Sequence, residues 1–421
     1  MKPEIHKVMQ TMADRACEAR RAAEIRPAED RTRAIETAAE AMHDQSGTIL
    51  AANAEDLARA RERGRPAAFI DRLELNQARL DGVIAGIRAI ALQPDPLGEA
   101  IEQWSAPSGV DIRQTRIPIG VLAVIFESRP NVAADAAALA IRSGNAVILR
   151  GGSDSQASSL AIVSAIRDGL AAADMPVDLV QHPETTDRDV VGALLSGLND
   201  RIDLVVPRGG RDLVARVQAE ARVAVLGHLD GVCHGYVHAS ADAEMARTII
   251  RNSKMRRTGV CNALECLLVD RDCLDTVWPQ IARDLSADGC ELRADEAARE
   301  AWPQAHAASN DDWGREYLDA ILAVRTVDGL DSALDHINRY GSGHTDLIIA
   351  SDEAAIRSFQ GRVDSAVVLA NASTGFSDGA EFGFGGEIGI ATSRLHARGP
   401  VGARQLTTFK YLVSGTGQIR G

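Results

Sequence analysis

The chain begins with about a hundred residues in which apolar positions recur every three or four residues, the spacing of one face of an α-helix. Ala, Glu and Arg dominate this stretch, and breaks at Arg26-Pro27 and at Gly64-Arg65-Pro66 separate its segments. The pattern predicts four helices, over residues 4–25, 28–43, 48–62 and 69–92.

Beyond this region, short and uniformly apolar runs alternate with helical segments. The pattern predicts strands over residues 121–126, 146–149, 177–181, 202–206 and 223–226, with helices over 133–142, 160–173, 187–198 and 211–221 between them. Strands that are apolar throughout and alternate with helices indicate a parallel sheet covered on both faces. Such sheets bind ligands beyond the carboxyl ends of their strands.

A second set of strands and helices runs from His234 to about Asn371. Its strands are expected over residues 264–269, 321–327, 346–349 and 366–369. Residues 104–117 predict a β-hairpin that turns near Ser108-Gly109. The tail beyond Asn371 is rich in Gly, which indicates either a loop held close to a ligand or a neighbouring subunit, or a plain surface loop.

The composition limits the function classes. With 46 Lys+Arg against 59 Asp+Glu, the 421-residue chain has a formal net charge of −13, which argues against a nucleic-acid-binding protein. A local group of Arg residues can still bind an anion. No apolar run of about 18 residues predicts a membrane span, and the charged N-terminus lacks the apolar core of a secretion signal. Six cysteines are too few for a disulfide framework, so a reducing cytoplasm is expected.

Cys261 is the candidate nucleophile. It lies in a turn with Gly259, before a predicted strand, and Lys254, Arg256 and Arg257 lie just upstream. Nearby cations raise the thiolate fraction of a cysteine, and a thiolate attacks an acyl or aldehyde carbon. The alternative for any single cysteine is a buried structural thiol.

The other cysteines and the histidines predict less. Cys266 and Cys273 fit the structural role. Cys233 adjoins His234, but neighbouring residues on a strand point to opposite faces, so a direct Cys–His pair is not expected. His234 and His238 are four residues apart on a predicted strand rather than on a helix, so no metal site is expected.

Two glycine-containing turns are candidate anion sites. The segments Arg150-Gly151-Gly152 and Pro207-Arg208-Gly209-Gly210 each follow a predicted strand and precede a helix, where free N–H groups suit an anion. A turn without a ligand is the alternative for either one. The chain has neither the G-x-G-x-x-G fingerprint after a strand nor the G-x-x-x-x-G-K-[ST] phosphate loop.

Motifs throughout the chain resemble those of the γ-glutamyl phosphate reductase family, also called glutamate-5-semialdehyde dehydrogenases. They occur in family order between about residue 117 and residue 420. The matching stretches include Glu127-Ser-Arg-Pro-Asn131, Ser143 to Gly152, Pro207 to Gly210, His228 to Val237, Thr258 to Ala263, Gly343 to Asp346, Glu381 to Gly389 and Leu406 to Tyr411.

The resemblance implies an aldehyde dehydrogenase-like α/β fold. The expected parts are two parallel-sheet domains and an oligomerisation arm made of a β-hairpin and the C-terminal tail. An NADP(H)-binding domain is expected over residues 1–103 and 118–230, a catalytic domain over 231–371, and the arm over 104–117 and 372–421. This superfamily binds its dinucleotide without the glycine fingerprint, which accounts for the missing motif.

The resemblance also implies a reaction. NADPH would reduce L-glutamyl 5-phosphate to L-glutamate 5-semialdehyde and phosphate, the second step of proline biosynthesis from glutamate, through a thioester on Cys261. Asn131 would stabilise the oxyanion together with the backbone N–H of Cys261. The expected cofactor contacts are Arg150, Gly151 and Gly152 at the ribose or 2′-phosphate, Pro207, Arg208, Gly209 and Gly210 at the pyrophosphate, and Glu316 at the nicotinamide ribose. Candidate substrate-binding residues are Arg129, Arg256 and Arg257.

The chain departs from the wider superfamily at one position. Aldehyde-oxidising members carry a general-base Glu in a Glu-Leu-Gly-Gly motif, whereas the matching stretch is His228-Leu-Asp-Gly231. The missing base fits a reductase, because hydrolysis of the thioester would discard the activated acyl group. His228 as a replacement base is the alternative. The expected partners are the small-molecule substrate, further copies of the chain and the upstream glutamate 5-kinase, with no nucleic acid and no membrane.

Overall fold

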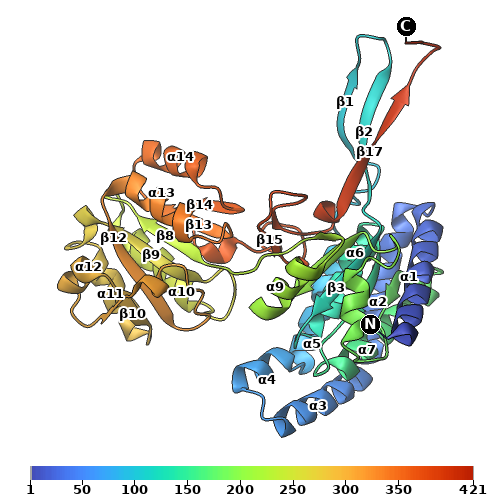
Figure 1. Cartoon of the computed structure of the whole chain (residues 1–421), viewed down its shortest axis with the longest axis horizontal. Helices are drawn as coiled ribbons and strands as arrows, with labels where there is room; N and C mark the ends of the chain where they lie inside the picture. The colour runs from blue at the N-terminus through green and yellow to red at the C-terminus, as the bar shows by residue number, and fades with distance from the viewer. Residues whose placement is uncertain (1, 421) are drawn as a thin grey trace. The chain divides into compact units, whose positions relative to one another are not determined.

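The computed structural model describes residues 2–420, apart from the side chain of residue 68, and divides into two units. Unit 1 comprises Met1–Gly227, Gly383–Gly389 and Val401–Gly421. Unit 2 comprises His228–Phe382 and Ile390–Pro400. Each unit contains its own parallel sheet (Figure 1). Within the described residues, no helix combines the length and apolarity needed to cross a bilayer.

Unit 1 contains a five-stranded parallel sheet in the order β5-β4-β3-β6-β7. Its strands are β3 (Val121–Phe126), β4 (Ala146–Arg150), β5 (Val180–Gln181), β6 (Leu204–Arg208) and β7 (Ala224–Val225). Every residue of β3 and β4 is buried, as expected for strands covered on both faces. The α/β prediction is therefore confirmed for this unit.

Helices cover the sheet of unit 1. They are α1 (Pro3–Glu24), α2 (Ala28–Asp44), α3 (Ser46–Glu62), α4 (Ala67–Leu73), α5 (Gln77–Ala91), α6 (Asn131–Arg142), α7 (Gln156–Ala172), α8 (Asp189–Leu195) and α9 (Arg211–Glu220), with a short 3-10 helix η1 (Val177–Leu179). Helices α6 and α7 pack together beneath α2, whereas α1 packs with α8 and against β3 and β4.

The expected single helix over residues 69–92 is wrong. Residues 74–76 break it into α4 and α5, because the Asn76 side chain caps α5 by accepting a 2.9 Å hydrogen bond from the Arg79 N–H. An Asn at this position satisfies an N–H that has no partner inside the helix.

A separate three-stranded antiparallel ribbon also belongs to unit 1. It consists of β1 (Ala100–Ser105), β2 (Asp111–Pro118) and the C-terminal strand β17 (Thr407–Ser414), with β2 in the centre. The predicted hairpin is confirmed, and β17 adds a third strand along β2 that the sequence pattern did not reveal (Figure 1).

Unit 2 contains a seven-stranded parallel sheet in the order β11-β10-β12-β9-β8-β13-β14. Its strands are β8 (Cys233–Val237), β9 (Leu264–Asp270), β10 (Glu291–Ala294), β11 (His306–Ala307), β12 (Ile321–Val327), β13 (Thr345–Ile349) and β14 (Val367–Ala370). One buried cluster contains Trp278 and another contains Phe359.

The sheet of unit 2 is flanked by helices and followed by a tail with little regular structure. The helices are α10 (Ala243–Met255), η2 (Arg271–Cys273), α11 (Trp278–Ala287), α12 (Glu296–Ala301), η3 (Asn310–Asp312), α13 (Gly329–Tyr340), α14 (Glu353–Arg362) and η4 (Thr374–Phe376). The tail contains the two-stranded pair β15 (Ile390–Ala391) and β16 (Gly399–Pro400), and η5 (Arg404–Leu406) precedes β17 in unit 1.

Candidate active site

Cys261 lies in the turn that joins α10 to β9, and its residue is half-buried. The turn stands at the amino end of β9. Cys233 begins the neighbouring strand β8, and His344 directly precedes β13 on the other side of β8. The candidate nucleophile therefore lies at the amino ends of three adjacent strands of this sheet.

The segment before β8 packs tightly on the turn that carries Cys261. A Cβ atom added to Gly231 would lie 2.3 Å from the carbonyl oxygen of Cys261 and 2.8 Å from its Cα. Real Cβ atoms do not approach other heavy atoms this closely, so only Gly fits at this position. The contact fixes the distance between the two segments.

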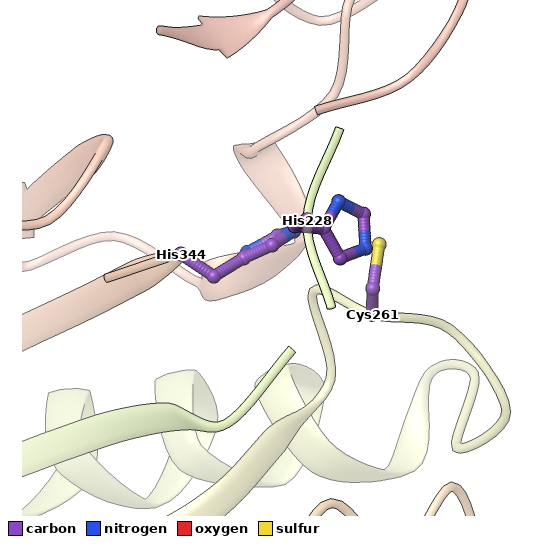
Figure 2. A group of neighbouring side chains, drawn as sticks. All are labelled: His228, Cys261 and His344. Atoms are coloured by element: carbon purple, nitrogen blue, oxygen red, sulfur yellow. The ribbon is translucent and has the colours of Figure 1, made fainter. Parts of the chain in front are cut away.

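Two histidines accompany the thiol. The Sγ atom of Cys261 and one ring nitrogen each from His228 and His344 all lie within 4.8 Å of one another. Figure 2 shows a ring nitrogen of His228 facing the sulfur, with His344 behind. The two imidazoles meet edge to face, with centroids 4.8 Å apart. Sequence analysis did not single out His344, whose only signal was its place in the matching stretch Gly343–Asp346.

Each histidine of this group uses Nδ1 for a hydrogen bond. Nδ1 of His228 lies 2.6 Å from the carbonyl oxygen of Ile390. Nδ1 of His344 lies 2.9 Å from Oγ1 of Thr345, and that hydroxyl donates in turn to Oγ of Ser377 at 2.9 Å. A carbonyl only accepts, and the Thr345 proton is already committed, so both Nδ1 atoms carry hydrogen and both Nε2 atoms carry a lone pair.

The remaining cysteines near the turn are structural. Cys233 is fully buried and its thiol donates to the carbonyl oxygen of Cys261 at 3.2 Å. Burial raises the pKa of Cys233 well above its usual value. The ring of its neighbour His234 lies on the opposite side of the strand, beside Asp346 and Cys266, as the strand geometry predicted. Cys266 and Cys273 are buried, also as predicted.

Glu316 lies in the same unit as Cys261. Its Oε1 accepts a 2.9 Å hydrogen bond from the backbone N–H of Gly231. The carboxylate therefore helps to fix the segment that packs on the nucleophile. Its expected contact with a nicotinamide ribose stays a prediction.

The basic run 251–257 is less available to anions than the sequence suggested. Arg251 pairs with Asp288 at 2.5 Å, and the fully buried ammonium of Lys254 pairs with Glu265 at 2.7 Å. Two of the cations are thus neutralised by carboxylates from other elements. Arg256 and Arg257 are exposed after the end of α10 and remain candidate substrate-binding residues.

Arg150 is the last residue of β4 and is buried at the rim of a pocket of about 400 Å³ in unit 1. Its guanidinium donates to the carbonyl oxygens of Gly151 and Thr186, the latter at 3.0 Å. Among the described residues its Nε has no hydrogen-bond partner. Burial lowers the pKa of Arg150, and the neighbouring guanidinium groups of Arg188 and Arg216 lower it further. Both neighbours line the same pocket.

A cluster of guanidinium groups in one pocket is costly unless an anion offsets their repulsion. The pocket is also lined by the rings of Phe69 and Phe126. A lining with cationic groups and two aromatic rings fits a phosphorylated nucleotide. The residues present therefore fit the expected dinucleotide.

The glycine turn after Arg150 is held by a neutral histidine. Nδ1 of His182 lies 2.9 Å from the Pro183 carbonyl oxygen, and its Nε2 accepts from the Gly151 N–H at 3.3 Å. Burial lowers the pKa of His182 to about 4, and the Arg150 charge contributes in the same direction. Sequence analysis gave no signal for this contact.

The second predicted anion turn differs in detail. Pro207 and Arg208 belong to β6, so the turn begins at Gly209. The carboxylate of Glu127 accepts a 3.0 Å hydrogen bond from the Gly210 N–H, and a Cβ on Gly209 would lie 2.5 Å from the same oxygen. The Gly210 N–H, which was expected to face a pyrophosphate, thus already donates to the Glu127 carboxylate. The assignment of Pro207–Gly210 to that role stays a prediction.

Asn131 is the first residue of α6, and its amide donates to the Asp135 carboxylate at 3.1 Å, one turn along the helix. Burial raises the pKa of Asp135 to about 6, although the Asn131 amide and the Arg208 charge lower it. Arg129 precedes this helix and is half-buried. It follows Ser128, a buried residue with a φ of 41°, so the segment after β3 makes a sharp turn.

Comparison with known proteins identifies the family. The family model described as "Aldehyde dehydrogenase family" matches residues 4–297. Proteins named gamma-glutamyl phosphate reductase are similar over the full length: that of Brucella suis is 52% identical with all of both chains covered, and that of Caulobacter vibrioides is 55% identical with 98% of this chain and 100% of the relative covered.

Solved structures give the same result. The crystal structure of gamma-glutamyl phosphate reductase from Thermotoga maritima is 41% identical, covers 98% of this chain and 100% of its own, and superposes with a TM-score of 0.95. An acetylating aldehyde dehydrogenase from Geobacillus thermoglucosidasius is 16% identical with a TM-score of 0.70, which shows a shared fold alone. Members of this family use nicotinamide cofactors. The chain belongs to the γ-glutamyl phosphate reductase family of oxidoreductases, within the aldehyde dehydrogenase family.

Proposed function

We propose that this protein reduces L-glutamyl 5-phosphate to L-glutamate 5-semialdehyde, with NADPH as the reductant, in the biosynthesis of proline. One observation carries the proposal. A half-buried cysteine is held between two fixed segments beside a histidine lone pair, in a chain that is 52% identical over its whole length to a protein named gamma-glutamyl phosphate reductase.

The nucleophile is Cys261. Nε2 of His228 carries a lone pair and faces the thiol, so it accepts the thiol proton as the sulfur attacks the acyl carbon. Phosphate leaves with the bonding electron pair, and the proton on His228 passes to the departing phosphate. The product of this step is a thioester on Cys261.

NADPH, when bound, would supply a hydride for the thioester carbon on Cys261. The resulting tetrahedral oxyanion then collapses, the aldehyde is released and the Cys261 thiolate is expelled. We assign the stabilisation of the oxyanion to the Asn131 amide and the Cys261 N–H. The segment His228-Leu-Asp-Gly231 contains no Glu that would activate water against the thioester.

The cofactor is assigned to the pocket of unit 1. Arg150, Arg188 and Arg216 line it beside Arg65, which pairs with Asp154, and these cations favour the additional phosphate of NADP over the plain ribose of NAD. Gly151 and Gly152 continue the turn after Arg150, and Glu316 is assigned to the nicotinamide ribose. Arg129, Arg256 and Arg257 remain candidates for the substrate phosphate and carboxylate.

The ribbon of β1, β2 and β17 is proposed as an oligomerisation arm. Apolar residues on it are exposed, including Trp104 (37%), Phe409 (45%), Tyr411 (54%) and Val413 (60%). Tyr411 contacts both Trp104 and Phe409 edge to face. A second copy of the chain would cover this surface. The contact with glutamate 5-kinase and the cytoplasmic location stay predictions from the sequence.

The proposal is tested in the reverse direction, by following the reduction of NADP⁺ with glutamate 5-semialdehyde and inorganic phosphate. The expected result is a phosphate-dependent signal that Cys261→Ala abolishes. Replacing phosphate by coenzyme A tests for an acyl-CoA reductase, the alternative within the same fold. A signal with coenzyme A but none with phosphate would overturn the proposed substrate, and full activity of Cys261→Ala would overturn the thioester.

A further inference from the structure

The group formed by Cys261, His228 and His344 has the ligand set of a metal site. One sulfur and two imidazole nitrogens lie within 4.8 Å of one another (Figure 2). Catalytic zinc sites have three protein ligands and leave the fourth coordination position to water or substrate. Thiolate and imidazole are ligands that select zinc-class ions over Mg²⁺ and Ca²⁺.

The hydrogen bonds around the group already place both histidines in the tautomer that binds a metal. Nδ1 of His228 donates to the Ile390 carbonyl, and Nδ1 of His344 donates to the Thr345 hydroxyl. Metal-binding histidines almost always donate their other ring N–H in this way, which fixes the ring and makes the free nitrogen more basic. Both Nε2 atoms therefore carry the lone pair that a metal ligand requires.

His344 supplies the second, independent observation. The residue is completely buried, and among the described residues its Nε2 has no hydrogen-bond partner. A buried nitrogen with an unused lone pair costs free energy that a bound ion would recover. His228 and Cys261 are only half-buried, so an ion has access from their side.

We propose that this group binds one zinc-class divalent ion, and that the bound ion blocks the nucleophile. The sulfur–metal bond forms as the thiol loses its proton to solvent, so each ion releases one proton and no electron is transferred. Water completes the fourth position. The binding is independent of the proposed function, whereas the consequence, reversible inhibition of the reductase, rests on it.

A second cluster of two histidines and one cysteine differs from this group because it is closed to solvent. His234, Cys266 and His336 also lie within 4.8 Å of one another, but all three are buried. Nδ1 of His336 accepts from the Arg325 guanidinium at 2.9 Å, and its Nε2 lies 3.6 Å from Sγ of Cys266. Both nitrogens of His336 are committed and a cation adjoins the ring, so this cluster serves as the internal control.

The test uses the full-length protein, reduced and freed of metal with a chelator, and titrated with Co²⁺ as a spectroscopic substitute for Zn²⁺. Binding at Cys261 should produce a thiolate-to-Co²⁺ charge-transfer band and the visible absorption of tetrahedral Co²⁺, saturating at one ion per chain. Zn²⁺ should abolish both signals by competition. Proton release measured in a weakly buffered solution should equal one per ion.

Variants assign the signal to its ligands. Cys261→Ser should remove the charge-transfer band, and His344→Gln should weaken Zn²⁺ binding at least tenfold. Thr345→Val keeps all three ligands but removes the acceptor for Nδ1 of His344, so it should weaken binding by about 10–100-fold. Cys266→Ser tests the buried cluster, and Cys17→Ser tests the other half-buried thiol of the chain. Both should bind like the unaltered protein.

The outcomes separate this inference from the proposed function. If the band is absent, or if it persists unchanged in Cys261→Ser, the metal site is refuted even if the reductase is active. If the band is present but no phosphate-dependent turnover is found, the metal site stands and the proposed function fails. When both hold, Thr345→Val should keep its turnover and require at least tenfold more Zn²⁺ for half inhibition.

Discussion

Gly231 packs directly against the backbone of Cys261. A Cβ atom at residue 231 would lie only 2.3 Å from the Cys261 carbonyl oxygen. Gly231→Ala must therefore push the nucleophile turn away. A displacement of about 1 Å at a reacting group costs up to about 100-fold in rate. We expect kcat to fall at least tenfold in Gly231→Ala, measured in the phosphate-dependent assay.

Gly361→Ala is the matched control for this change. Gly361 lies in α14 of the same unit and has nothing within 4 Å of its added Cβ. It should keep full activity and gain about 1 kcal/mol of helix stability. Equal activity in the two variants would show that the contact at Gly231 does not position the thiol.

Arg188 and Arg216 are expected to distinguish NADPH from NADH. Each side chain lines the pocket that contains Arg150. A hydrogen bond between charged groups contributes about 1.5–3 kcal/mol, which corresponds to about tenfold or more in affinity. Arg188→Gln should raise the KM for NADPH at least tenfold and change the KM for NADH little. Arg201→Gln removes the same charge outside the pocket. It controls for the effect of net charge on cofactor binding.

Asn131→Ala tests the oxyanion assignment. Removal of one donor from an oxyanion site costs about 100- to 1000-fold in kcat. We expect a loss of this size in kcat, with the KM for NADPH unchanged, in steady-state kinetics. A KM effect without a kcat effect would place Asn131 in cofactor binding instead.

His182 makes the stability of unit 1 dependent on pH. Burial lowers its pKa from 6.5 to about 4, so between these pH values the unfolded chain binds a proton that the folded chain does not. Its contribution is complete above pH 6.5 and is lost as the pH falls towards 4, by about 3 kcal/mol. Protonation of Nε2 also removes the acceptor of the Gly151 N–H.

The measurement is the denaturant midpoint of unfolding across this pH range. His182→Gln should flatten the pH dependence, whereas substitution of the exposed His306 should leave it as steep as in the unaltered protein. An unchanged pH dependence in His182→Gln would show that another group controls acid stability.

Tyr411→Asp tests the arm. The side chain is exposed on β17 and contacts both Trp104 and Phe409. A charge at the centre of this apolar surface should reduce the mass of the assembly in sedimentation analysis. Lys410→Gln, a change at the adjacent and oppositely directed position, should leave the assembly intact. An unaltered mass in Tyr411→Asp would exclude the ribbon as the interface.

The periodic pattern predicted most of the fold, because buried strands and amphipathic helices each impose their own spacing. It did not separate α4 from α5, since the capping role of Asn76 depends on one local hydrogen bond. It also did not predict β10 or β11, which are short and partly exposed.

The site was predicted only in part, for a related reason. Cys261 has a local signal in its turn, but His344 lies far along the chain and joins it only because β8, β9 and β13 are neighbours in the sheet. The pairing of Arg251 with Asp288 and of Lys254 with Glu265 likewise depends on packing between distant elements. No spacing in the sequence reveals such contacts.

The path of the chain sets the order in which the molecule can be completed during synthesis. Unit 1 includes residues 383–389 and 401–421, which leave the ribosome after nearly all of unit 2. Among them, the Leu406 carbonyl accepts from the Asn145 amide at 2.8 Å and β17 lines the full length of β2. Domains generally fold as they emerge. Here the parallel sheet and the helices of unit 1 are synthesised before unit 2, whereas the ribbon and the Asn145 contact are completed only by the last strand of the unit.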